Sequence, residues 1–503
     1  MIKKCGLLQI VVIFLLASCG SSNNENDVPS VPLLTLSGLT VDSVGNIFYP
    51  PFSPDTRHYA ASCGDGELFS MELTSINQEA QIYINNVMSG TGAASGSFDG
   101  YTSENDIVVE LTSEGYSEKY YLHCVTNEFP LVEITIKTED VDDGFMITSP
   151  NSGDKGYLLI LDNNGVPLFR RVIAGRVTDF KRHSDGRYSY ALRDSSRNEF
   201  GQWDNTIILL SSEFQEEANL KTIGLNHTDN HEFLISPEGT FIFASYNSSY
   251  RDMRPWGLSE NELTRDSVIQ ELNDQGEVLF EWDSWDHIDV NNCLNHRFPD
   301  DYAHLNSIQV APDGNLIASL RGCSMVVKID RAAGTGATIW DIGGLDPSLQ
   351  IVGDTFEEFC GQHTASEDED GNLYIFDNGG HCNGTREETS GLFSRALQYS
   401  LDLDAGQANF QRDYSLNGSY SEYSTSGGSF FLVRNGSWLI NWARGINDIT
   451  EVTLDSDIAF QFFFSSGGEK LRVYRAYRDY DLELPINIDG ELSFYRPNEQ
   501  TYH

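Results

Sequence analysis

The sequence predicts an all-β protein in which a six-bladed β-propeller follows a small N-terminal β-sandwich. After the N-terminal segment there is no long stretch of helical periodicity, and short alternating runs of β-branched and aromatic residues recur between clusters of Gly, Asp, Asn and Ser. A pair of turns then repeats along the C-terminal part of the chain. With 40% hydrophobic and 12% aromatic residues the chain can bury a large core, which excludes global disorder.

The charge balance limits the classes of partner. The 503 residues include 32 Lys and Arg against 75 Asp and Glu, for a formal net charge of −43. Nucleic acid is excluded as an expected partner because a phosphate backbone needs a basic face, and an anionic membrane surface is unfavourable for the same reason. A small anionic substrate remains open, provided that the few cations converge locally. The simplest interpretation of the charge is a solubilising surface.

The N-terminus has the features of an export signal. Residues 1–18 begin with two lysines and continue with an apolar run that is too short to cross a bilayer. The string Leu16-Ala17-Ser18-Cys19 resembles the lipobox of bacterial lipoproteins. This resemblance implies a lipid anchor on Cys19, a polar tether over residues 19–32 and a place at the outer membrane, on its periplasmic face or at the cell surface. The alternative is an ordinary signal peptide with a stray cysteine.

The cysteine count agrees with export. Eight cysteines are present, and removing Cys5 with the signal and Cys19 with the lipid leaves six. An even number in an oxidising compartment predicts disulfides. We expect Cys63–Cys124 within one domain, Cys360–Cys382 around a short loop and, by elimination, Cys293–Cys323.

Residues 33–127 have the size and the short strands of a β-sandwich, for example over 81–84 and 107–111. The strings Ser37-Gly38-Leu39-Thr40-Val41 and Lys119-Tyr120-Tyr121-Leu122 resemble the cadherin-like domain of bacterial surface proteins. The resemblance implies a spacer, with ligand binding as the alternative. Such a domain could also mediate a homodimer.

Residues 128–503 contain the repeat, in which two hairpin turns alternate along four strands. The first turns of successive units have glycines 53 to 75 residues apart, and they are Asp185-Gly186, Glu238-Gly239, Asp313-Gly314, Asp370-Gly371 and Asn435-Gly436. Four strands per unit is the pattern of propeller blades. We count five blades and expect a sixth to combine residues 132–135 with 471–474. A tandem of unrelated β-sandwiches explains the pattern less well, since it would not repeat the same pair of turns.

Three histidines lie at equivalent positions of successive repeat units. His231, His304 and His363 lie eight to ten residues before the first-turn glycine of their units, and Thr425 lies near the same place in the next unit. The strand that begins there is the innermost of each blade, so its start lies at one mouth of the central channel. The repeat therefore predicts that three imidazoles converge on the axis.

Arg321 helps to choose between the possible chemistries. It ends the strand after the Asp313-Gly314 turn, and the antiparallel return places it beside the strand of His304. A guanidinium repels a metal ion but binds a tetrahedral oxyanion through two hydrogen bonds. We therefore predict an anion site with no metal and no cofactor. A three-histidine zinc or copper site and purely structural histidines are the alternatives.

The strings around these residues resemble one enzyme family. Asn230-His231-Glu232-Phe233, His304-Leu305-Asn306-Ser307 and Gln362-His363-Thr364 are similar to motifs of the bacterial arylsulfate sulfotransferases. The resemblance implies a six-bladed propeller behind a small β-sandwich. It also implies transfer of a sulfuryl group from a phenolic sulfate to a phenol, without an adenylylated sulfate donor, by a ping-pong mechanism through a sulfated histidine.

The resemblance also implies roles for single residues. His363 would be the nucleophile, while His231, His304 and Arg321 would bind the sulfuryl oxygens and one of these two histidines would serve the leaving oxygen. The expected substrate-binding positions are Asn306, Thr425 and Tyr474. The chain departs from the family at Thr364, where an Asp is common. Two alternatives remain. One is a hydrolase that uses the same pocket, and the other is a non-catalytic surface propeller that binds glycans or proteins.

Overall fold

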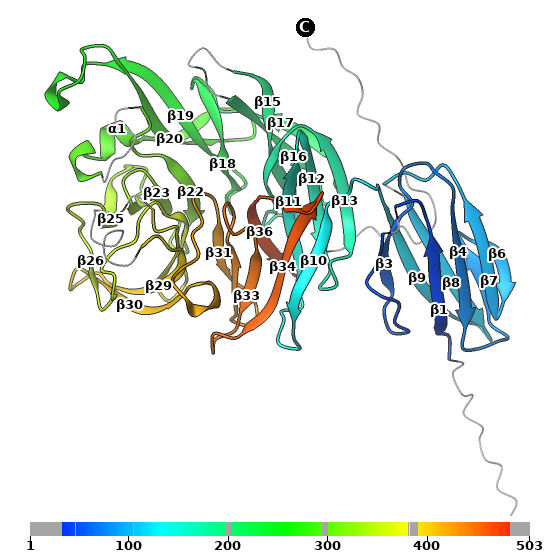
Figure 1. Cartoon of the computed structure of the whole chain (residues 1–503). Helices are drawn as coiled ribbons and strands as arrows, with labels where there is room; N and C mark the ends of the chain where they lie inside the picture. Colours follow the sequence, from blue (N-terminus) through cyan, green and yellow to red (C-terminus); the bar gives the residue numbers. More distant parts are fainter. Residues whose placement is uncertain are drawn as a thin grey trace, which may run out of the picture.

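A computed structural model describes residues 33–482 apart from 46, 104, 198–200, 202, 294–299, 381 and 383–390. In these residues the strands form seven sheets, a nine-stranded sheet at the N-terminus and six smaller sheets arranged in a ring (Figure 1). The predicted all-β fold with six propeller blades is thus confirmed. The expected signal peptide, tether and Cys19 lie outside the described residues. None of the helices in the described part has the length and apolar character needed to cross a membrane.

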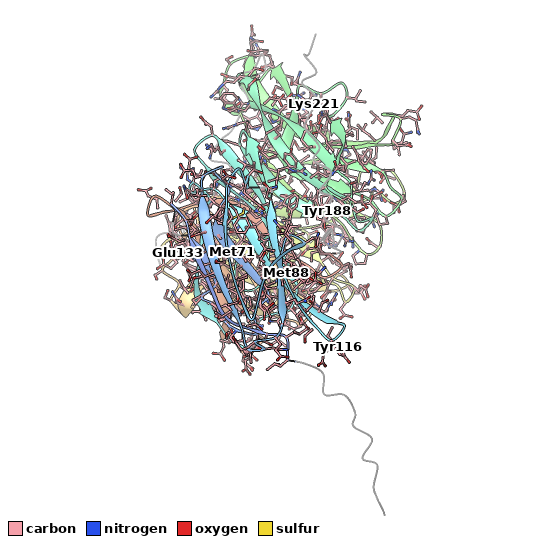
Figure 2. All side chains as sticks on the ribbon, turned by 90° about the vertical axis from the view of Figure 1, so that its right-hand side faces the viewer. Met71, Met88, Tyr116, Glu133, Tyr188 and Lys221 are labelled. Atoms are coloured by element: carbon pink, nitrogen blue, oxygen red, sulfur yellow. A yellow bond between two sulfur atoms is a disulfide. The ribbon has the colours of Figure 1, made fainter. Side chains whose placement is uncertain are left out.

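The N-terminal sheet curls around a single core and nearly closes on itself. Its strands are β1 (Leu36–Asp42), β2 (Phe48–Tyr49), β3 (His58–Ser62), β4 (Phe69–Ser75), β5 (Gln81–Ile84), β6 (Val87–Thr91), β7 (Ala93–Phe98), β8 (Asp106–Ser113) and β9 (Tyr116–Val125), in the order β1-β4-β7-β6-β5-β8-β9-β3-β2. Alternate residues face inwards as the period of two requires, so that Val109 is buried in the core whereas Met88 and Tyr116 are exposed (Figure 2).

The first three blades of the ring are ordinary four-stranded meanders. The first contains β36 (Val473–Asp479), β11 (Phe145–Ser152), β12 (Lys155–Leu161) and β13 (Pro167–Ala174); the second β14 (Val177–Arg182), β15 (Tyr188–Arg197), β16 (Trp203–Leu210) and β17 (Glu216–Leu220); the third β18 (His227–Ile235), β19 (Phe241–Arg251), β20 (Glu262–Leu272) and β21 (Val278–Asp283). The predicted first turns connect the inner two strands of the second and third blades.

The remaining blades complete the ring. The fourth contains β22 (Leu305–Val310), β23 (Leu316–Leu320), β24 (Met325–Ile329) and β25 (Thr338–Gly343); the fifth β27 (His363–Glu367), β28 (Asn372–Asp377), β29 (Arg395–Asp402), β30 (Gln407–Tyr414) and the short β26 (Gln350–Val352); the sixth β31 (Ser429–Leu432), β32 (Trp438–Asn441), β33 (Ile449–Val452), β34 (Ile458–Ser466), β35 (Glu469–Lys470) and β10 (Leu131–Lys137). The strands β36, β14, β18, β22, β27 and β31 contact one another in sequence around the axis.

Ring closure differs from the expected arrangement. Residues 132–135 and 471–474 do not share a blade. Instead β10 is the outer strand of the sixth blade, with Glu133 opposite Phe463, and β36 is the inner strand of the first, with Thr148 opposite Ala476. The two ends of the propeller chain therefore cross over between neighbouring blades, so each terminus is held by hydrogen bonds to a distant part of the chain.

The small domain packs against the first blade. Arg170 of β13 donates hydrogen bonds to the backbone oxygens of Cys124 and Asn105 and forms an ion pair of 2.8 Å with Asp106. Val125 and Phe129 pack in one apolar cluster with residues of β11 and β12. Both polar and apolar contacts therefore attach the N-terminal domain to the propeller.

Candidate active site

The three histidines that share a phase of the repeat come together in the structure. His231 lies in β18, His304 directly precedes β22, and His363 opens β27. The ring centroids of His231 and His304 are 5.2 Å apart, and both imidazoles act electrostatically on His363. Because β18, β22 and β27 are neighbouring inner strands, the convergence on the axis that the repeat predicts is present.

Irregular backbone at the start of these strands aims the side chains. The pairing register shifts between Thr228 and Phe233 in β18, between Leu305 and Ser307 in β22, and next to Thr364 in β27. His304 and Thr364 both have φ of 49°, a left-handed conformation that is unusual for residues with a Cβ atom. Bulges of this kind redirect side chains beside active sites, at the cost of local strain.

His363 is buried and held at both ring nitrogens. Its Nδ1 lies 2.6 Å from Oδ1 of Asn378, and the backbone N–H of Gly427 donates to its Nε2 over 3.0 Å. The amide nitrogen of Asn378 donates to the backbone oxygens of Ser424 and Gly427, both at 3.0 Å. The amide oxygen therefore faces the imidazole, so Nδ1 carries the proton and Nε2 the lone pair.

The surroundings of His363 keep its ring neutral. Burial, followed by the charge of Arg321, holds the pKa of His363 well below the ordinary imidazole value, although the hydrogen bond to Asn378 acts in the opposite direction. At neutral pH the Nε2 lone pair is thus not lost to a proton. A neutral imidazole in a cationic surrounding is suited to act as a nucleophile towards an anionic group.

His231 and His304 each have a carboxylate partner. Nδ1 of His231 lies 2.5 Å from Asp229, and Nδ1 of His304 lies 2.5 Å from Asp301. Burial lowers the pKa of His304, and the charge of Asp301 opposes this effect. Such pairs fix the orientation and the tautomer of each ring, so that Nε2 is the nitrogen left to exchange a proton with a ligand.

Arg321, Thr425 and Tyr474 lie at this mouth as predicted. Arg321 is buried and acts electrostatically on both His363 and His304, and its Nη2 is 3.5 Å from the backbone oxygen of Thr425. The ring of Tyr474 is 5.8 Å from that of His231. The exposed Thr425 and the buried Tyr474 thus flank the histidines on the side of the fifth-to-sixth blade loop and of β36.

Asn306 lies beside the residue that precedes His363. Its side chain is fully buried, and its amide nitrogen donates to the backbone oxygen of Gln362 over 2.7 Å. Its own backbone oxygen accepts hydrogen bonds from Tyr474 (3.3 Å) and Arg475 (2.8 Å). Asn306 therefore connects β22 and β36 to the residue that precedes His363.

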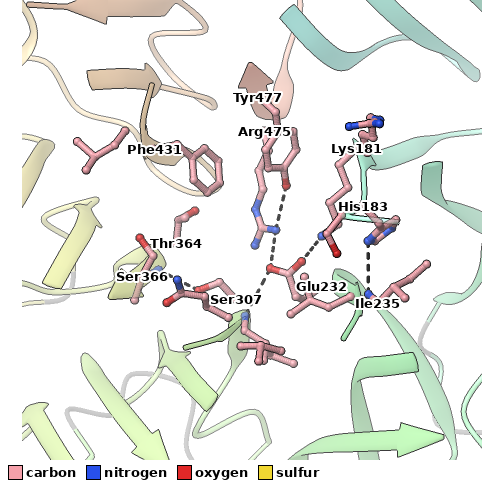
Figure 3. A pocket seen from close by; sticks show the side chains of 18 of the residues that line it. Lys181, His183, Glu232, Ile235, Ser307, Thr364, Ser366, Phe431, Arg475 and Tyr477 are labelled. Carbon is pink, nitrogen blue, oxygen red and sulfur yellow. Dashed lines mark hydrogen bonds and ion pairs between the residues drawn. The ribbon is translucent and has the colours of Figure 1, made fainter. Parts of the chain in front are cut away.

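Buried charged side chains of the inner strands form a belt, of which Figure 3 shows Lys181, Glu232 and Arg475. Arg475 forms ion pairs with Asp179 (3.1 Å) and Glu232 (2.7 Å), and Lys181 contacts the same two carboxylates. Beyond this belt the channel contains a cavity of about 470 Å³ at the mouth opposite the histidines, lined by residues of the inner strands, such as Thr364. The belt therefore separates the histidines from that cavity.

Comparison with known families agrees with this arrangement. A sequence model described as "Arylsulfotransferase (ASST)" matches residues 211–465, which are 255 of the 503 residues. The chain belongs to the arylsulfotransferase family. Membership supports arylsulfotransferase activity in general, with small aryl sulfates and phenols as the substrates of the family. None of the curated proteins matches the sequence.

Solved structures resemble this arylsulfotransferase only distantly. A Bacteroides caccae protein of unknown function is 12% identical and has a TM-score of 0.41. The alignment covers 64% of this chain and 93% of the Bacteroides caccae chain. A virginiamycin B lyase from Staphylococcus aureus, crystallised with quinupristin, is 11% identical over 69% of this chain and 99% of its own, with a TM-score of 0.35.

Four further residues of this arylsulfotransferase site were not predicted from the sequence: Asn378, Gly427, Asp229 and Asp301. The two aspartates carry a weak signal, since they lie two and three residues before His231 and His304 and can reach the same ring nitrogen. Gly427 has no such signal, because it is 64 residues away in the chain and approaches His363 from the neighbouring sixth blade.

The three predicted disulfides of this arylsulfotransferase, Cys63–Cys124, Cys293–Cys323 and Cys360–Cys382, are all present. Among the residues that the structure places, the only three potential metal ligands with atoms within 4.8 Å of one another are Glu358, Cys360 and Cys382. Two of these form a disulfide. His231, His304 and His363 do not form such a group in the described residues.

Proposed function

We propose that this protein transfers a sulfuryl group from a phenolic sulfate to a phenolic acceptor by a ping-pong mechanism through sulfated His363. The observation that carries the proposal is the state of His363, a buried neutral imidazole with its proton on Nδ1 and its lone pair on Nε2. Arg321, His231 and His304 surround it with groups that interact favourably with an anion.

In the first half-reaction, Nε2 of His363 attacks the sulfur and the bond between sulfur and the aryl oxygen breaks. The aryl oxygen leaves with the electron pair and takes a proton from His304 or His231, each of which is oriented by a carboxylate at Nδ1. Nδ1–H of His363 remains bonded to Asn378 throughout, so the positive charge that forms on the ring is oriented by the amide oxygen.

In the second half-reaction, the acceptor phenol attacks the sulfur and the bond between sulfur and Nε2 breaks. The phenolic proton passes to the histidine that lost one in the first step, so protons balance over the cycle. Sulfuryl transfer resembles phosphoryl transfer in having a loose transition state, in which positioned cations stabilise the equatorial oxygens. Arg321 serves this purpose because its guanidinium stays charged at any working pH.

The test uses purified residues 20–503 with 4-nitrophenyl sulfate, with and without phenol, while nitrophenolate release is followed. We expect release that depends on phenol and is lost in His363→Ala. Without acceptor, peptide mass spectrometry should find one added SO₃ group on His363. Release that ignores phenol would instead indicate a hydrolase, and a wild-type protein that is neither labelled nor active on a panel of donors would indicate a binding propeller.

The cellular setting remains a separate proposal. We propose that Cys19 carries the lipid and anchors the protein at the outer membrane, as its lipobox-like context suggests. Labelling with radioactive palmitate should be lost in Cys19→Ser, and the variant should move to the soluble fraction. A homodimer through the N-terminal domain also remains a prediction, and the molar mass in light scattering tests it.

A further inference from the structure

Four exposed arginines gather at the histidine mouth of the channel. Arg176, Arg193, Arg444 and Arg472 are exposed, and none forms an ion pair within the part of the chain that the structure describes. By contrast Arg254, another exposed arginine, pairs with Asp252 and Glu260. Unpaired arginines are unexpected in a protein that carries 75 acidic residues. We call the four residues the arginine rim.

The arginine rim adjoins the loop that covers His363. A Cβ atom on Gly427 would lie 3.4 Å from Nη2 of Arg472, and the N–H of this same glycine donates to Nε2 of His363. The backbone of Arg444 pairs with Thr425 (2.8 Å) in the same loop. These two arginines therefore lie beside the candidate nucleophile, at the entrance to its site.

The other two members lie at the same entrance. Arg176 directly precedes the inner strand β14, and the backbone N–H of Arg193 donates to its carbonyl oxygen over 3.0 Å. Arg472 is close enough to Arg444 and Arg176 that, after burial, their charges contribute to lowering its pKa. Like charges repel when they are gathered in this way, so the rim is stabilised by an anion that lies between its members.

We propose that the arginine rim binds a second anionic group of the donor, so that the preferred substrates are aryl sulfates whose ring carries a further carboxylate or sulfate. This inference rests on the proposed function, in which the transferred sulfuryl group lies between His363 and Arg321. A donor with a single charge leaves the rim empty. A guanidinium binds both carboxylate and sulfate oxygens in a bidentate manner, so the rim selects the second charge.

The kinetic test compares 4-nitrophenyl sulfate with 3-carboxy-4-nitrophenyl sulfate, with phenol as the acceptor. We expect the wild type to prefer the carboxylated donor about tenfold in kcat/KM, the size of one charge-assisted contact. The double variant Arg176→Gln/Arg472→Gln should lose this preference, so that the ratio falls to about one. The matched control Arg254→Gln removes a paired arginine and should retain the ratio. A wild type with no preference, or a preference that survives in the double variant, overturns the inference.

A binding measurement separates this inference from the proposed reaction. Isothermal titration with isophthalate and with benzoate requires no turnover. We expect isophthalate to bind about tenfold more tightly, with a difference that shrinks as NaCl is added and vanishes in the double variant. If no donor reacts but isophthalate still binds more tightly than benzoate, the proposed reaction is wrong and the proposed role of the arginine rim is supported. If donors react and isophthalate binds no more tightly than benzoate, the proposed role of the arginine rim is wrong and the proposed reaction is supported.

Discussion

The backbone N–H of Gly427 donates a hydrogen bond to Nε2 of His363 over 3.0 Å, and this is the nitrogen that attacks sulfur in the proposed reaction. The lone pair cannot accept this hydrogen bond and form a bond to sulfur at the same time. Gly427 and Gly428 have φ of 73° and 105°, so the loop adopts a conformation that favours glycine at both positions. The loop must therefore release His363 when a donor binds.

Release of the loop predicts a change in amide exchange. Binding of 4-nitrobenzenesulfonate, which resembles the donor but cannot transfer its sulfur group, should speed hydrogen exchange of the amide of Gly427 because the hydrogen bond to His363 is lost. Mass spectrometry of the peptide that contains this residue measures the rate. The turn at Gly436, in the same blade but away from the site, should exchange at an unchanged rate. Slower exchange at Gly427 would show that the loop closes rather than opens.

Asn378→Asp should change the pH dependence of the reaction. In the wild type His363 stays neutral far below the ordinary imidazole range, so the acidic limb of kcat/KM lies at low pH. A carboxylate beside Nδ1 stabilises the charged ring and raises its pKa, so the acidic limb should move up by roughly one to two pH units. Rates of nitrophenolate release across a pH series measure the shift.

The substitution Asn315→Asp is the control for this shift. Asn315 is half-buried and directly follows the Asp313-Gly314 turn at the other mouth, so its replacement should leave the profile unchanged. An acidic limb that stays in place in Asn378→Asp would show that the protonation of His363 does not limit the rate.

Asp301→Asn should affect donors according to their leaving group. The carboxylate supports the protonated form of His304, and an amide in its place does not. Proton donation matters most for a basic leaving oxygen, so kcat/KM for phenyl sulfate should fall by roughly two to four orders of magnitude. 4-Nitrophenyl sulfate should lose far less, because its leaving oxygen is already a weak base. Equal losses for both donors would assign Asp301 a structural role only.

Arg475→Gln should destabilise the propeller. The guanidinium is buried between Asp179 and Glu232, and removing it leaves carboxylates without full compensation. The free energy of unfolding should fall by roughly 3–5 kcal/mol. Urea denaturation measures the loss, with the exposed Arg254→Gln expected within about 0.5 kcal/mol of the wild type. A loss below about 1 kcal/mol would contradict a stabilising role for the belt.

Several parts of the fold and site were predictable because they repeat or lie close together in the chain. Each propeller blade brings the same phase of its repeat to the axis, so the spacing of His231, His304 and His363 from their turn glycines already predicts their convergence. The alternating pattern of β8 likewise predicts its buried face. The even number of cysteines predicts disulfides, and the structure contains the three pairs that we expected.

The sequence alone thus determined the propeller class and the mouth at which the three histidines gather. Only the tertiary structure decided that β10 and β36 close different blades, that Gly427 occupies Nε2 of His363 and that the arginine rim gathers at one entrance. The physical reason is that a repeat encodes contacts within a blade and between equivalent positions. Contacts between non-equivalent positions of neighbouring blades depend on the final angle and register of the ring, which no local pattern records.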